Sequence, residues 1–184
     1  LLKKFKLSNK ELIELTRLSI IYRDNDCAVY LLNQFDDPGF IFNNRNQSFL
    51  HFSSQVRNLY IMEYLLEIKK VTPNTVSINF STPLSESLSR NEEINKKMVD
   101  LLLKHNANVH LLSYELEKTF LFKHDKLIKK LIKTIDIEFL YESLKYATKE
   151  QHINLIRNRL FYSWTPLLKS EIPKEVLCHV KNYI

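Results

Sequence analysis

A pair of adjacent leucines recurs along this chain at nearly even intervals. The pairs are Leu31-Leu32, Leu65-Leu66 and Leu102-Leu103, and successive pairs lie 34 and 37 residues apart. Recurrence on this scale predicts a stacked, repeated pair of helices, because one such unit cannot bury its apolar face by itself. A few extra residues near 92–95, in a turn between two helices, account for the longer interval. We therefore expect these leucines to be largely buried between consecutive helix pairs.

The stretch 81–111 shows the repeated unit most completely. Thr82 is suited to cap a helix, and Pro83 then occupies the first helical position, where a missing N–H has no cost. A second helix follows with an apolar stripe of period near 3.6. Asn106 comes directly after it, and asparagine is the best substitute for glycine in the left-handed conformation that ends a helix.

This stretch resembles an ankyrin repeat, whose pattern reads T-P-L-H, two short helices, V-x-x-L-L and then G-A-D-V-N. Residues 48–51 and 61–66 align with the same pattern one repeat earlier, and His51 occupies the place of the histidine. The resemblance implies that His51 links neighbouring loops by hydrogen bonds. Ser85 stands at that place in the next repeat, so we expect the bridging there to be incomplete. The resemblance also implies an all-α fold, an ankyrin-repeat solenoid of about four to five degenerate repeats over residues 1–160.

The remaining helices are predicted less directly. Ser8 or Asn9 is expected to cap a first helix, and Asp37-Pro38-Gly39 predicts a turn that opens a projecting loop. After Leu111 the pattern decays. Apolar residues over 127–132 predict a shortened fourth repeat, and residues 139–160 predict a last pair of helices with no consensus, as expected of a terminal unit.

Composition excludes several classes of protein. The length of 184 residues fits one domain, or one domain with a short appended element. Gly39 is the only glycine, which excludes a glycine-rich phosphate loop. Cys27 and Cys178 lie far apart, so we expect neither a disulfide framework nor a cysteine zinc site, and we expect a reducing compartment. We expect no signal peptide and no membrane span. Because the first residue is Leu1, we expect a fragment of a longer chain.

Charge and catalytic motifs point away from nucleic-acid binding and catalysis. The net charge is +6, but the lysines lie beside apolar helix positions, which indicates that they belong to solvated helix faces. Cys178 and His179 are neighbours in sequence and would not face each other on a helix. Residues 24–26 lack the glycine and the glutamate of a calcium loop. We predict a protein that is not an enzyme, with no cofactor and no metal.

The end of the chain changes character, so residues 161–184 are predicted to form a separate segment. Residues 172–184 resemble the first helix of an F-box, which reads roughly L-P-x-E-V-L-x-x-I-x-x-Y-L. The matching residues are Ile172, Pro173, Glu175, Val176, Leu177, Val180, Tyr183 and Ile184. The resemblance implies that they recruit the Skp adaptor of a cullin–RING ubiquitin ligase. A SOCS box is a rival that lacks its L-C-R pattern here, and a simple capping helix is the alternative.

Ankyrin repeats followed by a truncated F-box resemble the poxvirus ankyrin proteins with a PRANC domain. Members of that family are host-range and immune-evasion factors. The resemblance implies that the repeats bind a host protein in the cytoplasm, or also the nucleus, of the host cell. One alternative is an ankyrin scaffold that sequesters a host protein without recruiting a ligase. Another, a nucleic-acid-binding helical protein, rests on net charge only.

The candidate residues for binding the target lie in the predicted loops between helix pairs. They are Phe40, Phe42, Asn74, Val76 and Tyr114. Aromatic residues on a projecting loop supply a large contact area at little rotamer cost, and they are frequent hot spots of interfaces. The alternative is that Phe40 and Phe42 fold back under the helix pairs.

Overall fold

The structure is a computed structural model that describes side chains up to residue 160. The described residues are 7–40, 42–88, 93–109, 119–120, 123–136, 139–140 and 143–168. Within these ranges every regular element is a helix, which confirms the predicted all-α class. The chain forms two compact units, residues 1–108 and residues 109–184.

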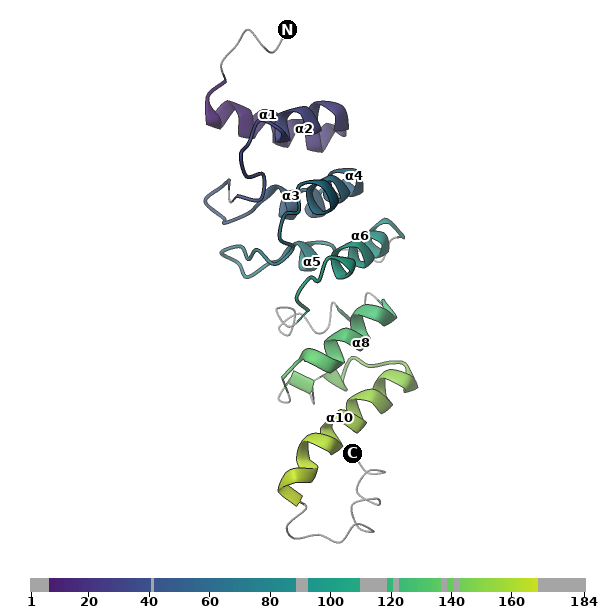
Figure 1. Ribbon diagram of the computed structural model, residues 1–184. Helices are drawn as coiled ribbons and strands as arrows, with labels where there is room; N and C mark the ends of the chain where they lie inside the picture. Colours follow the sequence, from purple (N-terminus) through teal and green to yellow (C-terminus); the bar gives the residue numbers. More distant parts are fainter. Residues whose placement is uncertain are drawn as a thin grey trace. The chain divides into compact units, whose positions relative to one another are not determined.

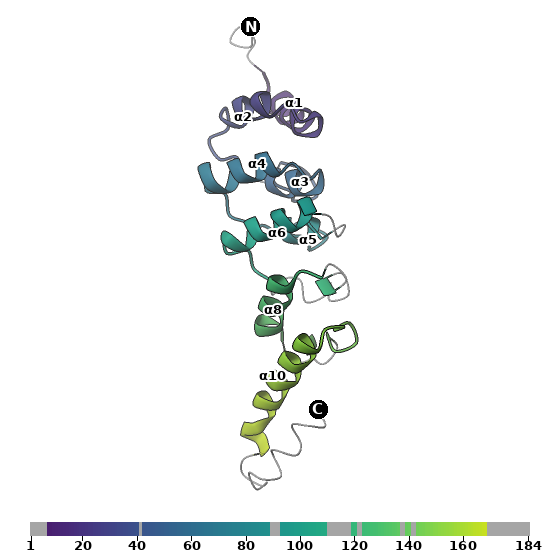
Figure 2. The same ribbon diagram turned by 90° about the vertical axis from the view of Figure 1, so that its right-hand side faces the viewer.

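The first unit consists of three layers, each made of two helices (Figures 1 and 2). The pairs are α1 (Asn9–Tyr22) with α2 (Asn25–Leu32), α3 (Phe49–Gln55) with α4 (Leu59–Glu63), and α5 (Pro83–Glu86) with α6 (Glu93–Lys104). The helix of α4 continues as a π-helical segment, η2 (Tyr64–Ile68). Successive layers contact each other through α1 and α3, α2 and α4, α3 and α5, and α4 and α6.

The predicted helix starts are confirmed in detail. Ser8 caps α1 and forms a capping box with Glu11, which decides between Ser8 and Asn9. Thr82 caps α5, where its hydroxyl accepts a hydrogen bond from the Ser85 N–H at 3.1 Å, and Pro83 is the first helical residue. These side chains satisfy N–H groups that have no partner inside the helix.

Most of the repeated leucines form the core, as predicted. Leu31, Leu32, Leu65, Leu66 and Leu102 are all buried. Leu103 is less deeply buried than the others, since it is half-buried. Leu32 and Leu66 hold the equivalent place in the first two layers, and each is followed by another layer of the same unit. Leu103 belongs to the last layer of this unit, so no further layer within the unit covers it.

Backbone conformations recur with the repeat. Arg23 caps the end of α1, and Arg57 lies two residues after the end of α3. The two lie 34 residues apart, and both have left-handed φ angles, of 60° and 59°. Asn106 follows α6 with a φ of 62°, which confirms the predicted left-handed cap. Gly39 does not adopt a positive φ. A Cβ atom at Gly39 would lie 3.1 Å from Val71 Cγ1, so glycine provides space there.

A buried asparagine joins the first two layers. Asn58 caps α4 through its side-chain oxygen. Its Nδ2 donates to the Ile20 carbonyl at 3.1 Å and to Asn25 Oδ1 at 3.0 Å, both in the layer before. Asn58 thus satisfies buried polar groups of two layers at once, as a buried amide must.

The second unit contains α8 (Asp125–Thr134) and α10 (Glu150–Leu168), which contact each other. The predicted apolar stripe on α8 is confirmed, since Leu127, Ile128, Leu131 and Ile132 are buried. The Arg159 guanidinium on α10 donates to the Ile132 carbonyl. Lys149 Nζ lies 2.7 Å from Asp125 Oδ1. The helix α10 runs through residue 160, where we placed the end of the solenoid, and that division into domains stays a prediction.

Candidate interaction surface

Two loops between the layers lie on one side of the first unit (Figure 1). Each folds back on itself: the Phe42 N–H donates to the Gln47 carbonyl at 3.0 Å, and the Ser77 N–H donates to the Ser81 carbonyl at 2.9 Å. The Ile78 N–H also donates to the Arg45 carbonyl at 2.9 Å, which ties the two loops together. Residues 42–47 and 77–81 therefore make one continuous surface, called here the loop edge.

The first loop turns its aromatic side chains inward. The Phe42 ring stacks on the Phe49 ring with 4.6 Å between centroids, and the Phe40 and Phe35 rings lie 5.8 and 5.3 Å from it. Phe49 is fully buried, and Phe40 and Phe42 are half-buried. The two candidate phenylalanines thus fold back, as the alternative interpretation held. Contact between a partner and the exposed parts of Phe40 and Phe42 stays a prediction.

The other candidate residues differ in their surroundings. Asn74 Oδ1 accepts a hydrogen bond from the Asn108 N–H at 2.7 Å, and its Nδ2 donates to the Asn106 carbonyl at 3.4 Å. Asn74 therefore joins the second loop to the turn after α6. Val76 is half-buried. Tyr114 lies outside the described residues, and its role stays a prediction.

His51 makes the bridge that its position in the repeat implied. Its Nε2 donates to the Ser81 carbonyl at 3.1 Å, and its Nδ1 accepts from the Ser48 N–H at 3.3 Å. Burial lowers the pKa of His51, so the neutral imidazole is the stable form. The side chain of Ser85, at the equivalent place one layer on, bonds only to Thr82 among the described residues. The bridge is present between the second and third layers and is not repeated by Ser85.

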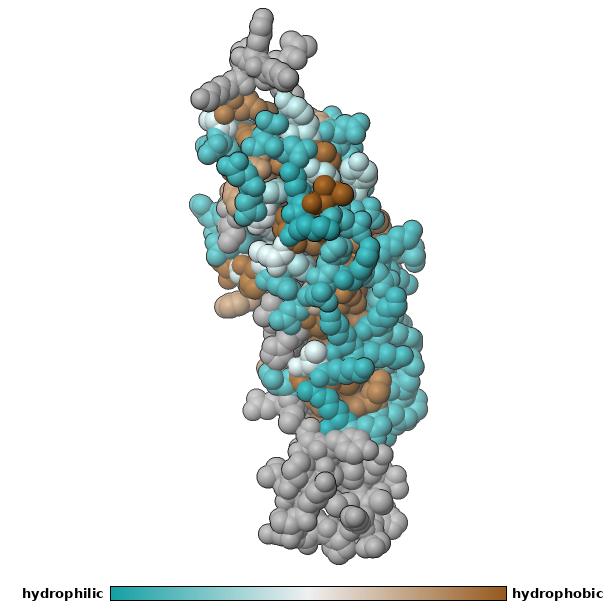
Figure 3. Space-filling model, viewed as in Figure 1, coloured by the Kyte–Doolittle hydropathy of each residue, from teal (hydrophilic) through white to brown (hydrophobic). Residues whose placement is uncertain are grey.

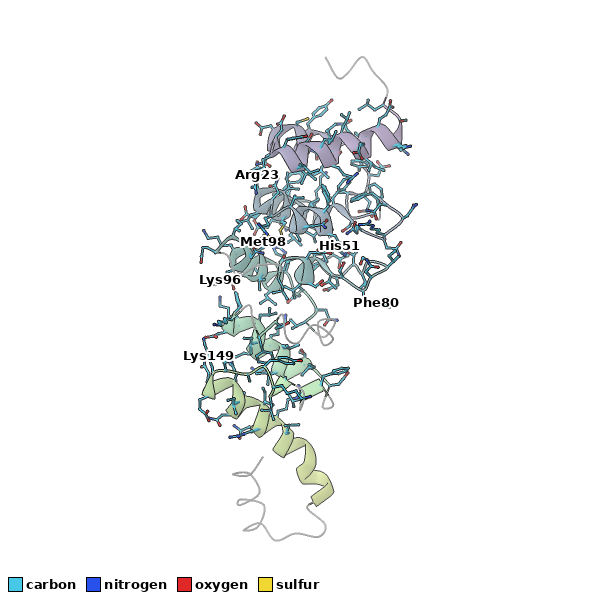
Figure 4. All side chains as sticks on the ribbon, turned by 180° about the vertical axis from the view of Figure 1, so that it is seen from behind. Arg23, His51, Phe80, Lys96, Met98 and Lys149 are labelled. Atoms are coloured by element: carbon cyan, nitrogen blue, oxygen red, sulfur yellow. The ribbon has the colours of Figure 1, made fainter. Side chains whose placement is uncertain are left out.

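The second loop exposes two large apolar side chains. Ile78 is 53% exposed and Phe80 is 71% exposed. Figure 4 shows Phe80 at the outer end of its loop, away from the helices, and Figure 3 shows hydrophobic residues on the side where the loops lie. Phe80 has a φ of 58°, a strained conformation for a bulky residue. Ile78 and Phe80 were not among the predicted candidates, although two apolar residues inside the polar run S-I-N-F-S are a signal of such a pair.

The tip of the second loop is held by a serine pair. The Ser77 hydroxyl accepts from the Asn79 and Ser81 N–H groups at 3.3 and 3.1 Å, and it lies 2.8 Å from the Ser81 hydroxyl. These bonds fix the backbone on both sides of Phe80. Fixed aromatic residues at a protein surface lose little entropy on binding.

Beside the loop edge lies an open hollow of about 550 Å³. Its walls come from α1, the first loop and α3, and its floor includes the rings of Phe42 and Phe52. The polar residues that line it are Arg17, Asn43, Asn44, Arg45, Gln47 and Gln55. The lining therefore combines two guanidinium groups with four amides, and no carboxylate lines it.

The described residues contain no group of three histidine, cysteine or acidic side chains placed to hold a metal ion. Among them, no helix combines the length and the apolar character that crossing a membrane requires.

The Cys27 thiol accepts a hydrogen bond from the Ser19 hydroxyl at 3.3 Å. All of the candidate adaptor-binding residues, from Ile172 to Ile184, lie outside the described residues, and their role stays a prediction.

Comparison with known proteins adds no family. No protein-family model matches the chain, and no curated protein matches it either. The loop edge and the hollow beside it are therefore interpreted from their own geometry.

Proposed function

We propose that the first unit is a protein-interaction module of the ankyrin type, which binds a host protein through the loop edge. One observation carries this proposal: Phe80 is strained and 71% exposed at the end of a loop whose backbone is fixed on both sides. Strained conformations cluster at functional sites, and exposed aromatic residues on well-held loops are frequent anchors of interfaces.

The ankyrin assignment rests on four features. They are the spacing of the buried leucines, the Thr82-Pro83 helix start, the left-handed Asn106, and the bridge from His51 to the next loop. Each has the physical role that the repeat pattern gives it.

A photo-crosslinking residue at position 80 tests the binding surface. Benzoylphenylalanine in place of Phe80 is expected to crosslink the full chain to one discrete protein in a host-cell lysate. The matched control is the same substitution at Tyr60, which is 52% exposed on α4, away from the loop edge. Equal crosslinking from both positions, or none from position 80, would contradict the proposal.

We also propose that the C-terminal segment recruits a Skp adaptor, so that the bound host protein is ubiquitinated. This part rests on the resemblance of residues 172–184 to an F-box. Coexpression with the adaptor tests it. The adaptor should copurify with the chain, and replacing Pro173 and Leu177 together by Ala should abolish copurification while the circular dichroism of the repeats is unchanged. If the intact chain never retains the adaptor, the function is a sequestering scaffold.

A further inference from the structure

We propose that the hollow beside the loop edge receives an acidic side chain of the partner, next to an apolar residue that contacts Ile78 and Phe80. The inference rests on the proposed function, since it specifies the chemistry of the segment that the loop edge would bind. The ligand class is an extended or helical peptide that presents Asp or Glu beside a large apolar residue.

The first argument is the position of the Arg17 guanidinium. Its Cζ lies 5.0 Å from the centre of the Phe52 ring, which holds the cation by its π face. Its Nη1 donates to Glu14 Oε2 at 2.7 Å. The Arg17 side chain is 34% exposed and lines the hollow. Arg17 is thus oriented before binding, and an incoming carboxylate is the acceptor that an arginine prefers.

The second argument is the position of Arg45 on the first loop. The Asn43 side-chain oxygen accepts from the Arg45 N–H at 3.0 Å, and the Arg45 carbonyl accepts from the Ile78 N–H at 2.9 Å. The backbone of Arg45 is therefore fixed directly beside the exposed tip of the second loop. Its side chain is exposed and has no ion-pair partner among the described residues. Arg45 thus lies between the cationic hollow and the second loop, which exposes Ile78 and Phe80.

The third argument concerns the class of ligand. A polynucleotide is bound by a run of cations along its backbone, whereas this hollow offers two arginines among amide side chains. Asn43 and Gln47 bond to each other within the loop. Amides such as those of Asn44 and Gln55 can donate to and accept from a peptide backbone. Two cations beside an apolar tip fit one carboxylate and one apolar side chain of a peptide.

The test uses an array of synthetic 12-residue peptides. Each peptide carries a Leu-Phe core, and one Glu, Gln or Lys is placed at every offset from that core. The full chain is expected to bind the best Glu peptide about threefold to tenfold more tightly than its Gln counterpart, the range for a few partly exposed ion pairs. That preference should weaken between about 50 and 200 mM salt, because the charges are partly exposed.

Two substitutions of equal charge locate the effect. Arg45→Glu is expected to remove the preference for Glu and to favour the Lys peptides. Lys97→Glu, an exposed lysine on α6, changes the net charge equally and should leave the preference intact. Glu14→Gln frees Arg17 from its ion pair, so it should strengthen Glu binding by about twofold.

The possible outcomes separate the two proposals. Binding of Leu-Phe peptides with no preference among Glu, Gln and Lys would overturn the acidic-ligand inference and leave the loop edge as an apolar binding surface. Binding of no peptide, together with failure of the crosslinking at position 80, would overturn the proposed function itself. Displacement of the Glu peptides by single-stranded DNA at equal concentration would show a general polyanion surface, which also overturns the inference.

Discussion

The two loops of the first unit have similar backbone conformations, but their apolar side chains point in different directions. Asn46 and Phe80 both adopt left-handed conformations, with φ angles of 55° and 58°, and lie 34 residues apart. In the first loop the aromatic rings pack inward on Phe49, and in the second loop Ile78 and Phe80 lie at the surface. The repeat therefore fixes the path of the chain and leaves the direction of the side chains to local packing.

The first residue of each inner helix explains the difference. Phe49 begins α3 directly after its cap Ser48, and Pro83 begins α5 directly after its cap Thr82, again 34 residues on. The Phe49 ring offers a broad surface for aromatic neighbours of the first loop. Pro83 has no aromatic ring, so the position equivalent to Phe49 does not provide the ring on which the first loop packs.

The largest effect is expected from removing that ring. Phe49→Ala should lower the free energy of unfolding by about 3–5 kcal/mol, because Phe49 is fully buried among three other rings. Phe80→Ala should change it by no more than about 0.5 kcal/mol, since most of the ring is in solvent. Urea unfolding followed by circular dichroism measures both. Similar costs for the two variants would abolish the distinction between the loops.

Sequence reasoning succeeded where the signal is local. Helix caps such as Thr82 act on the N–H groups three residues away, and the left-handed Asn106 follows from its place after a helix, so the spacing of residue types suffices. Phe40 and Phe42 turn inward because they pack on Phe49, which lies in another element. The spacing of apolar residues in the sequence does not predict a contact of this kind. The left-handed Phe80 has no signature, because aromatic residues rarely adopt that conformation.

The bridge between layers is expected to have the next largest effect. His51→Ala removes one of the two donors to the Ser81 carbonyl and opens a cavity, so the free energy of unfolding should fall by about 1–3 kcal/mol. Ser85→Ala is the matched control, because the Ser85 hydroxyl bonds within its own helix start. Its cost should be smaller by at least half. An equal cost for both variants would mean that His51 adds nothing between the layers.

The same histidine makes stability depend on pH. Burial lowers the pKa of His51 below its usual value near 6.5, so the unfolded chain binds a proton more readily than the folded one. Stability from this group is complete above the unfolded pKa and is lost as the pH falls below it, by at most about 1.4 kcal/mol per pH unit. Burial lowers the pKa of His152 in the same direction. His51→Gln should reduce the slope between pH 7 and pH 5 without abolishing it, and an unchanged slope would contradict the assignment.

A smaller effect is expected from the asparagine that we first predicted to bind a target. Asn74→Ala removes two hydrogen bonds to the turn after α6, at an exposed position, and should cost about 1 kcal/mol. Binding of the Leu-Phe peptides should be unchanged, because the amide is used inside the fold. Asn74→Asp keeps the acceptor for the Asn108 N–H, so it should retain part of the stability. If Asn74→Ala loses binding of the Leu-Phe peptides and keeps normal stability, Asn74 is a contact residue after all.

The smallest change in stability is the most informative about function. Glycine adopts a left-handed φ without steric cost, and relief of about 1–2 kcal/mol of strain at Phe80 is offset by about 0.5–1 kcal/mol of backbone entropy. Phe80→Gly should therefore stabilise the fold by up to about 1 kcal/mol while it removes the ring that we propose as the contact with the partner. Phe80→Ala loses the same ring and keeps the strained backbone, so the difference between the two variants isolates the backbone contribution. Greater stability together with weaker binding of the Leu-Phe peptides would show that the strained residue is kept for recognition. If Phe80→Gly destabilises the protein instead, the ring is part of the packing, and the contrast between the two loops loses its main support.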